Sequence, residues 1–237
     1  MFMSRVEMQL TYRCNLKCRM CNRLCDKFPL DDDMTVGQVE TFVRKLEEER
    51  RTIVRIKLVG GEPTLHPDFL TICELLSAAV QKGLVGKVAV NSNGLTQSQF
   101  TKPLPPGVNW KLSPAKNKRH RPYLWSPKDL GLVGRGPCKM PRICGFSLDV
   151  KGWLPCSGGV AIARLFGHEH LYRPLDGPLP TKEWGMAELC QDCIHGIDDF
   201  FATDFKSMPV EWDKPSPRWA EAMEKYERER SVSNDTV

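Results

Sequence analysis

The chain has 237 residues, a formal net charge of +5 and 27% charged residues. Its mean hydropathy is −0.37, and no apolar run approaches the roughly 18 residues that a membrane-spanning helix needs. The N-terminus lacks the layout of a secretory signal. These properties exclude a membrane protein and predict a cytoplasmic protein of one domain, or of one domain with an appendage. The charge excess is too small to indicate a nucleic-acid partner.

Cysteine is frequent, with ten residues in all. Without a secretory signal, so many thiols indicate metal ligands in a reducing compartment rather than disulfides. Cys14, Cys18 and Cys21 follow an expected strand at residues 6–12. Three thiolates can hold a [4Fe–4S] cluster, which normally takes four, and leave one iron open for a reactant. The alternative for this spacing is a zinc knuckle. Cys25 is interpreted as a partly buried loop thiol rather than a ligand.

Strands and helices alternate after this loop. Thr35 and Gln38 form a capping box at the start of an amphipathic helix. A second helix is expected from about Pro67 to Gly83, with Cys73 on its buried face. Strands are expected at residues 53–59, 87–90 and 108–112. This order predicts parallel strands with right-handed crossovers, and ligands of such folds bind at the carboxyl ends of the strands.

Polar and glycine-rich segments stand at those carboxyl ends. Gly60-Gly61-Glu62-Pro63 ends the second strand, Asn91-Ser92-Asn93-Gly94 ends the third and Ser113 ends the fourth. Glycine lets the backbone approach a ligand closely, and a carboxylate can hold an ammonium group. The loop with three cysteines and these segments therefore predict one ligand site at one edge of the sheet.

The order and spacing of the three motifs resemble those of the radical SAM enzymes. In that family the open iron binds S-adenosylmethionine (SAM), and one electron cleaves SAM to methionine and a 5′-deoxyadenosyl radical, which abstracts hydrogen from a substrate C–H bond. The resemblance implies Cys14, Cys18 and Cys21 as catalytic, cluster-binding residues and a flavodoxin- or ferredoxin-type electron donor. Glu62 is then expected to hold the SAM ammonium, and Met20 stands where relatives often carry an aromatic residue near the adenine. The implied SAM-binding residues are Met20, Gly60, Gly61, Glu62, Pro63, Asn91, Asn93 and Ser113.

A second cysteine group follows in the C-terminal half. It includes Cys156, expected on the second strand of a hairpin at residues 148–156, and a CxxC pair, Cys190 and Cys193. This part resembles the twitch or SPASM appendage of radical SAM enzymes, which holds an auxiliary [4Fe–4S] cluster. Cys138 and Cys144 are alternatives for the remaining ligand position, or both are used. Four thiolates also suit zinc, which is the alternative metal.

The short distance between Ser113 and Cys138 leaves no room for two further strand–helix units. The expected fold is therefore α/β, a reduced radical SAM β/α barrel with parallel strands and a small C-terminal cysteine-rich hairpin appendage. We expect the barrel at residues 1–132, the auxiliary region at 133–200, and a C-terminal helix with a disordered tail at 201–237. The helix is expected to end near Arg230, with Ser216 as its cap. A basic stretch at residues 116–121 is either a solvated loop or a lid over an anionic substrate.

These features predict a radical SAM enzyme with one catalytic and one auxiliary cluster. A ribosomal peptide is the first expected substrate, because such appendages recur among peptide-modifying members. Against it, no leader-binding domain is expected ahead of the first strand. The alternative substrate is a small phosphorylated metabolite, a sugar or a nucleotide, which the basic stretch would suit. A different class of function is a non-catalytic, metal-stabilised module that binds nucleic acid.

Overall fold

The computed structural model describes residues 4–96, 103–113, 123–134, 138–197, 211 and 214–234. Six strands form one sheet in the order β4–β3–β2–β1–β5–β6. All neighbouring pairs are parallel except β5 and β6, which form an antiparallel hairpin. The strands are β1 (Arg5–Gln9), β2 (Arg55–Val59), β3 (Val88–Ser92), β4 (Val108–Leu112), β5 (Phe146–Asp149) and β6 (Gly152–Leu154). Within the described residues the sheet stays open between β4 and β6, so the α/β fold is a partial barrel, as expected.

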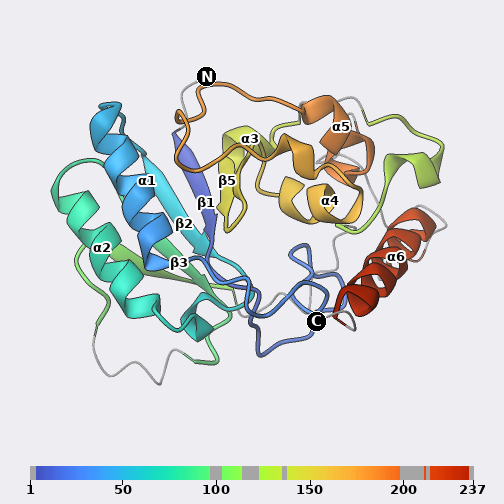
Figure 1. The fold of residues 1–237 in the computed structure, drawn as a ribbon, viewed down its shortest axis with the longest axis horizontal. Helices are drawn as coiled ribbons and strands as arrows, with labels where there is room; N and C mark the ends of the chain where they lie inside the picture. The colour runs from blue at the N-terminus through green and yellow to red at the C-terminus, as the bar shows by residue number, and fades with distance from the viewer. Residues whose placement is uncertain are drawn as a thin grey trace.

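Two helices, α1 (Val36–Glu48) and α2 (Phe69–Gln81), cover one face of the sheet (Figure 1). The capping box predicted for α1 is present, because Thr35 Oγ1 accepts from the Gln38 amide and the Gln38 side chain accepts from the Thr35 amide. After α2 the chain turns at Gly83, whose φ of +74° favours glycine. The predicted helices are therefore confirmed, with ends shifted by one or two residues.

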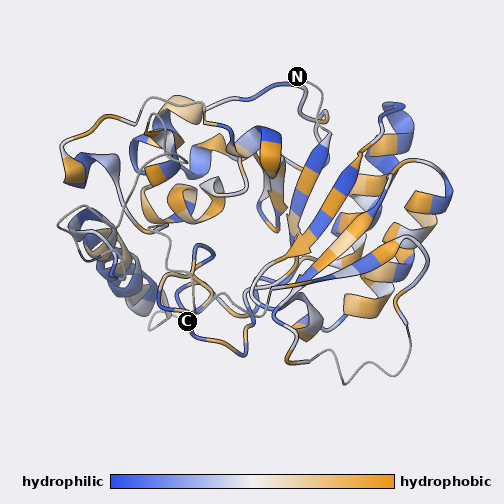
Figure 2. Cartoon of the chain, turned by 180° about the vertical axis from the view of Figure 1, so that it is seen from behind, coloured by the Kyte–Doolittle hydropathy of each residue, from blue (hydrophilic) through white to orange (hydrophobic). Residues whose placement is uncertain are grey.

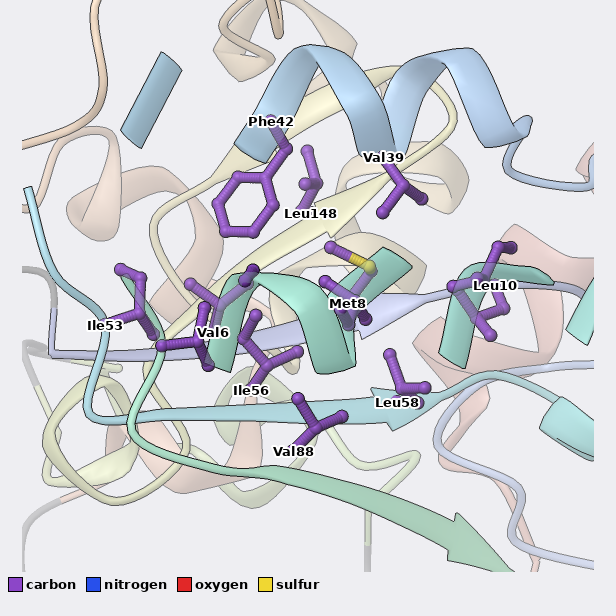
Figure 3. Close-up of a cluster of buried hydrophobic side chains, with 14 of the residues drawn as sticks. Val6, Met8, Leu10, Val39, Phe42, Ile53, Ile56, Leu58, Val88 and Leu148 are labelled. Carbon is purple, nitrogen blue, oxygen red and sulfur yellow. The ribbon is translucent and has the colours of Figure 1, made fainter. Parts of the chain in front are cut away.

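The strands alternate hydrophobic and hydrophilic residues (Figure 2), and on β1 this alternation separates a core face from a polar face. Val6 and Met8 point toward α1, where they meet Phe42 and the apolar residues of β2 (Figure 3). Glu7 lies between them in sequence, and successive side chains of a strand point to opposite faces. The polar face of β1 therefore lies away from the helical layer.

The described part of the C-terminal half adds four α-helices, and the last three of them lie on the other side of the molecule from α1 and α2 (Figure 1). Apolar residues of these three helices form a second cluster with Tyr12, Leu24 and Phe28 of the loop after β1. None of the helices in the described ranges is long and apolar enough to cross a membrane. The helices are α3 (Met140–Ile143), α4 (Gly159–Leu165), α5 (Met186–Gln191) and α6 (Pro217–Asn234).

Two local predictions need correction. The hairpin exists, but its first strand joins the main sheet beside β1, and Cys156 lies two residues beyond β6 rather than on it. The first residues of the expected tail, 231–234, are still helical, since α6 continues to Asn234, and the Ser231 hydroxyl donates to the Arg228 carbonyl. Ser216 directly precedes α6, as expected, and its carbonyl accepts from the Ala220 amide, while its hydroxyl accepts from the Ser126 amide.

Candidate active site

One cavity of about 890 Å³ lies at the carboxyl ends of the strands. It is bounded by the loop after β1, by the ends of β2, β3 and β4, and by the C-terminal half. Nine of the ten cysteines line it, and the tenth, Cys73, is buried in α2 as predicted. The two cysteine groups, which are more than a hundred residues apart in sequence, therefore face the same space. The lining cysteines are Cys14, Cys18, Cys21, Cys25, Cys138, Cys144, Cys156, Cys190 and Cys193.

The loop that carries the first group is held by the glycine pair after β2. The amides of Gly61 and Glu62 donate to the carbonyls of Thr11 and Arg13, each at 2.8 Å. A Cβ atom on Gly61 would lie 2.1 Å from the Arg13 carbonyl oxygen, so no larger residue fits there. Gly60 has a φ of +151°, and a Cβ atom on it would lie 2.4 Å from the Thr11 carbonyl oxygen. The glycines were expected to let the backbone approach a ligand closely. In the structure they let it approach the backbone of Thr11 and Arg13, which lead into the cysteine loop.

Glu62 connects the second strand end to the third. Its carboxylate accepts from the Thr64 hydroxyl and from the Asn93 amide, both at 2.8 Å, and the residue is fully buried. Asn93 in turn donates from Nδ2 to Asn15 Oδ1 at 2.7 Å, within the first cysteine group. The three sequence motifs are therefore joined by hydrogen bonds. Both carboxylate oxygens of Glu62 already accept hydrogen bonds from the protein itself. The expected contact between Glu62 and the SAM ammonium therefore stays a prediction.

We expect Glu62→Gln to lower the free energy of unfolding of the metal-free protein by about 1–3 kcal/mol, since a buried donor on Thr64 or Asn93 loses its acceptor. Urea denaturation measures this difference. The matched control is Glu48→Gln on the exposed surface of α1, where solvent screens the ion pair with Arg44 and its loss should change the stability little. Equal losses in the two variants would contradict the proposed joining role of Glu62.

Cys25, which was interpreted as a loop thiol and not as a ligand, is in direct contact with the first cysteine group. Its Sγ atom is 3.9 Å from Cys21 Sγ, and its side chain is buried. The contact with Cys25 lowers the pKa of Cys21 to about 6, whereas the pKa of Cys25 is raised by the same contact and by burial. Cys21 is therefore disposed to be a thiolate, the form that binds metals.

The second group divides into four thiols that lie together and one that lies apart. Burial raises the pKa of Cys156, and the neighbouring Cys193, Cys138 and Cys190 raise it further. The pKa values of Cys190 and Cys193 are likewise raised, to about 11 and about 12. Ionising several buried thiols next to one another is costly unless a cation binds to them. A bound metal supplies that cation and deprotonates the thiols that coordinate it. The donor set therefore fits a site for four thiolates.

Cys144 belongs elsewhere in the cavity. Its Sγ atom is 4.0 Å from Lys57 Nζ, and its pKa is raised by burial and by Glu7 rather than by the other cysteines. Of the two alternatives for the remaining ligand, the geometry therefore favours Cys138. No three His, Cys, Asp or Glu side chains in the described segments converge on a point where a single metal ion would bind.

The CxxC pair is held by α6, which sequence reasoning did not predict. Between the two cysteines, Asp192 is 2% exposed, and its carboxylate accepts from Arg218 and from the Ser126 hydroxyl. The Trp219 indole donates to the Asp192 carbonyl at 2.9 Å. Farther along α6, Glu227 pairs with Lys27 at 2.6 Å, just beyond the first cysteine group. One helix thus contacts both cysteine-bearing loops (Figure 1).

The remaining predicted site residues differ in their placement. Glu62 and Pro63 are buried behind the cavity and do not line it. The basic stretch at 116–121 lies outside the described residues, although Tyr123 just after it reaches the cavity. The predicted residues that do line the cavity are Met20, Gly60, Gly61, Asn91, Asn93 and Ser113.

Together, the fold and site define a partial β/α barrel with a thiol-lined cavity at the carboxyl ends of its strands. The sequence profile of the Radical SAM superfamily matches residues 8–102. A probable GTP 3′,8-cyclase of Thermococcus kodakarensis is 31% identical over 101 residues, which are 43% of this chain and 31% of that protein. The S-adenosylmethionine-dependent nucleotide dehydratase of Selenomonas ruminantium is 30% identical over 90 residues, 38% of this chain and 30% of that protein. These matches show that residues 8–102 are similar to the radical SAM superfamily.

A crystal structure of BtrN in an open conformation aligns with 89% of this chain and 93% of its own, with 15% identity and a TM-score of 0.44. The aligned region of the curated relatives is short, and the chain spans only 31% and 30% of the length of the two named above.

Proposed function

We propose that this chain binds a [4Fe–4S] cluster through Cys14, Cys18 and Cys21 and cleaves SAM reductively. The observation that carries the proposal is the cavity that these three thiols line together with the ends of β2, β3 and β4. When bound, the cluster supplies the electron that converts SAM to methionine and a 5′-deoxyadenosyl radical, and three protein thiolates leave it one open iron. The chain itself supplies the position of SAM and a site that limits access of water.

The wall beside the first cysteine group offers the polar atoms that SAM requires. Asn91 Oδ1 accepts from the Ser113 hydroxyl at 3.4 Å, and Asn93 is fixed by its bonds to Glu62 and Asn15. Both asparagines and Gly60 line the cavity. We place the methionyl and ribose parts of SAM against this wall and the adenine toward Met20.

The proposal includes a second [4Fe–4S] cluster, held by the four thiols that lie together across the cavity. A cluster with four protein ligands has no open iron, so it would accept an electron from the substrate or contact the substrate rather than bind SAM. This arrangement is what the resemblance to twitch and SPASM appendages implies. The proposed ligands are Cys138, Cys156, Cys190 and Cys193.

For the substrate we propose a nucleotide. The relatives are named for GTP cyclisation and nucleotide dehydration, and these names favour the small phosphorylated metabolite over the ribosomal peptide. The cavity volume also falls within the range of small-molecule sites. Nothing in the described residues supports a peptide over a nucleotide.

The test is anaerobic reconstitution with iron and sulfide, followed by incubation with SAM and dithionite. We expect 5′-deoxyadenosine as a product, formed several-fold faster in the presence of one member of a panel of ribonucleotides. Deuterium transferred from a perdeuterated nucleotide into 5′-deoxyadenosine would identify that nucleotide as the substrate. Failure to form 5′-deoxyadenosine would contradict the reaction. Formation that no nucleotide accelerates would contradict the substrate class alone.

A further inference from the structure

Three charged side chains, Glu7, Arg23 and Lys57, form a buried ion triad on the cavity side of the sheet. Glu7 and Lys57 are directly paired in the parallel register of β1 and β2. One oxygen of Glu7 accepts from Lys57 Nζ and the other accepts from Arg23. The exposed fractions of the three side chains are 3% for Glu7, 11% for Arg23 and 14% for Lys57, and all three line the cavity.

The triad carries an excess of one positive charge. Burial alone would raise the pKa of Glu7, but Arg23 and Lys57 outweigh this effect and lower it to about 2. The carboxylate is therefore ionised and balances only one of the two cations. A buried charge without a partner is costly, and the cost is offset when an opposite charge is bound. The excess therefore favours an anionic ligand at this point in the cavity.

Arg23 is not the cation that is free to make a new contact. Its guanidinium donates to Glu7, to the Ser157 carbonyl at 2.8 Å and to Gln9 Oε1 at 3.5 Å. This arrangement fixes it between the first cysteine loop and the C-terminal half. It thereby holds Glu7 in place but directs few of its own hydrogen atoms into the cavity.

Lys57 differs, because an ammonium group has three donors. One donor goes to Glu7, and the other contact recorded in the described part of the chain is Cys144 Sγ at 4.0 Å, where a thiol is only a weak acceptor. Lys57 therefore keeps donor capacity toward the cavity. The ammonium lies beside Cys144, and Lys57 shares the cavity lining with Gly60 and Gly61 at the end of β2 and with Ser157 of the C-terminal half.

We propose that Lys57 binds a phosphate group of the substrate, with Glu7 and Arg23 as the residues that position its ammonium. This inference rests on the proposed nucleotide substrate and names the residue that recognises its charged part. It also gives a role to the separate position of Cys144, which lies beside the bound phosphate rather than on the auxiliary cluster.

The experiment compares GTP with guanosine, measured by equilibrium dialysis against the reconstituted holoenzyme with SAM and without reductant. We expect the wild type to bind GTP more tightly than guanosine. In Lys57→Met this preference should fall by about ten- to a hundredfold, the loss of one charge-assisted hydrogen bond. Guanosine affinity should stay unchanged, and Lys57→Arg should keep most of the preference. The matched control is Lys82→Met, an exposed lysine paired with Glu47, which should bind as the wild type does.

A second variant covers the case in which Lys57→Met fails to fold. Lys57→Met combined with Glu7→Gln keeps the net charge of the triad at +1 and should lose the preference for GTP equally. If either folded variant keeps the full preference, the assignment of Lys57 is wrong while the nucleotide substrate stands. If the wild type binds guanosine as tightly as GTP, phosphate recognition is wrong. If it binds neither, the proposed substrate is wrong as well.

Discussion

Replacing Cys14, Cys18 and Cys21 together with alanine will reduce 5′-deoxyadenosine formation to the background rate and leave about half of the iron. The wild type should carry about eight irons, four for each [4Fe–4S] cluster, and the variant about four. The two sites share no ligand, because the first group lies on the loop after β1 and the four thiols of the second group lie in the C-terminal half. Iron analysis and chromatography of the SAM products measure both quantities.

The control for this prediction is Cys73→Ala. This substitution also removes a thiol, but Cys73 is buried in the core between α2 and the sheet and does not line the cavity. Its loss should lower stability and leave both the iron content and SAM cleavage at wild-type levels. If the triple variant still formed 5′-deoxyadenosine at the wild-type rate, the first cysteine group would not be the catalytic site.

The second large effect separates Cys138 from Cys144. Cys138→Ala should remove about four irons and the EPR signal that does not respond to SAM, since it breaks a closed set of four thiolates. Cys144→Ala should keep about eight irons, because its thiol lies beside Lys57 and away from the other four. The opposite pattern would show that Cys144 is the ligand. A zinc site would instead give about four irons and one zinc in the wild type.

Local structure was predictable where a few neighbouring residues decide it. The capping box at Thr35, the turn at Gly83 and the buried thiol of Cys73 were all predicted, because each depends on backbone geometry or on helix periodicity. The position of the first cysteine group on one loop beside the cavity was predictable for a different reason, because its three thiols are close in sequence after a strand. Their role as ligands of one cluster stays a prediction.

Contacts between distant segments were not predictable in the same way. The alternation of β1 places Glu7 on the face of the sheet that points away from the helical layer. Only the register with β2 shows that Lys57 lies beside Glu7. The choice between Cys138 and Cys144 depends on how a short helix, α3, is placed against the sheet. Nothing in the sequence near Asp192 indicates that Arg218 and Trp219 hold it, because that contact requires α6 to return to the cysteine pair.

The pairing of β1 with β5 bears on how the N-terminal half can be studied. In the whole chain β1 is a central strand, with β2 on one side and β5 on the other. A fragment that ended before β5 would leave the backbone groups of β1 that face β5, such as those of Glu7, on a new, unprotected edge. Exposed edges of this kind pair with other chains and promote aggregation. The barrel strands therefore depend on the cysteine-rich half for their solubility as well as for the second wall of the cavity.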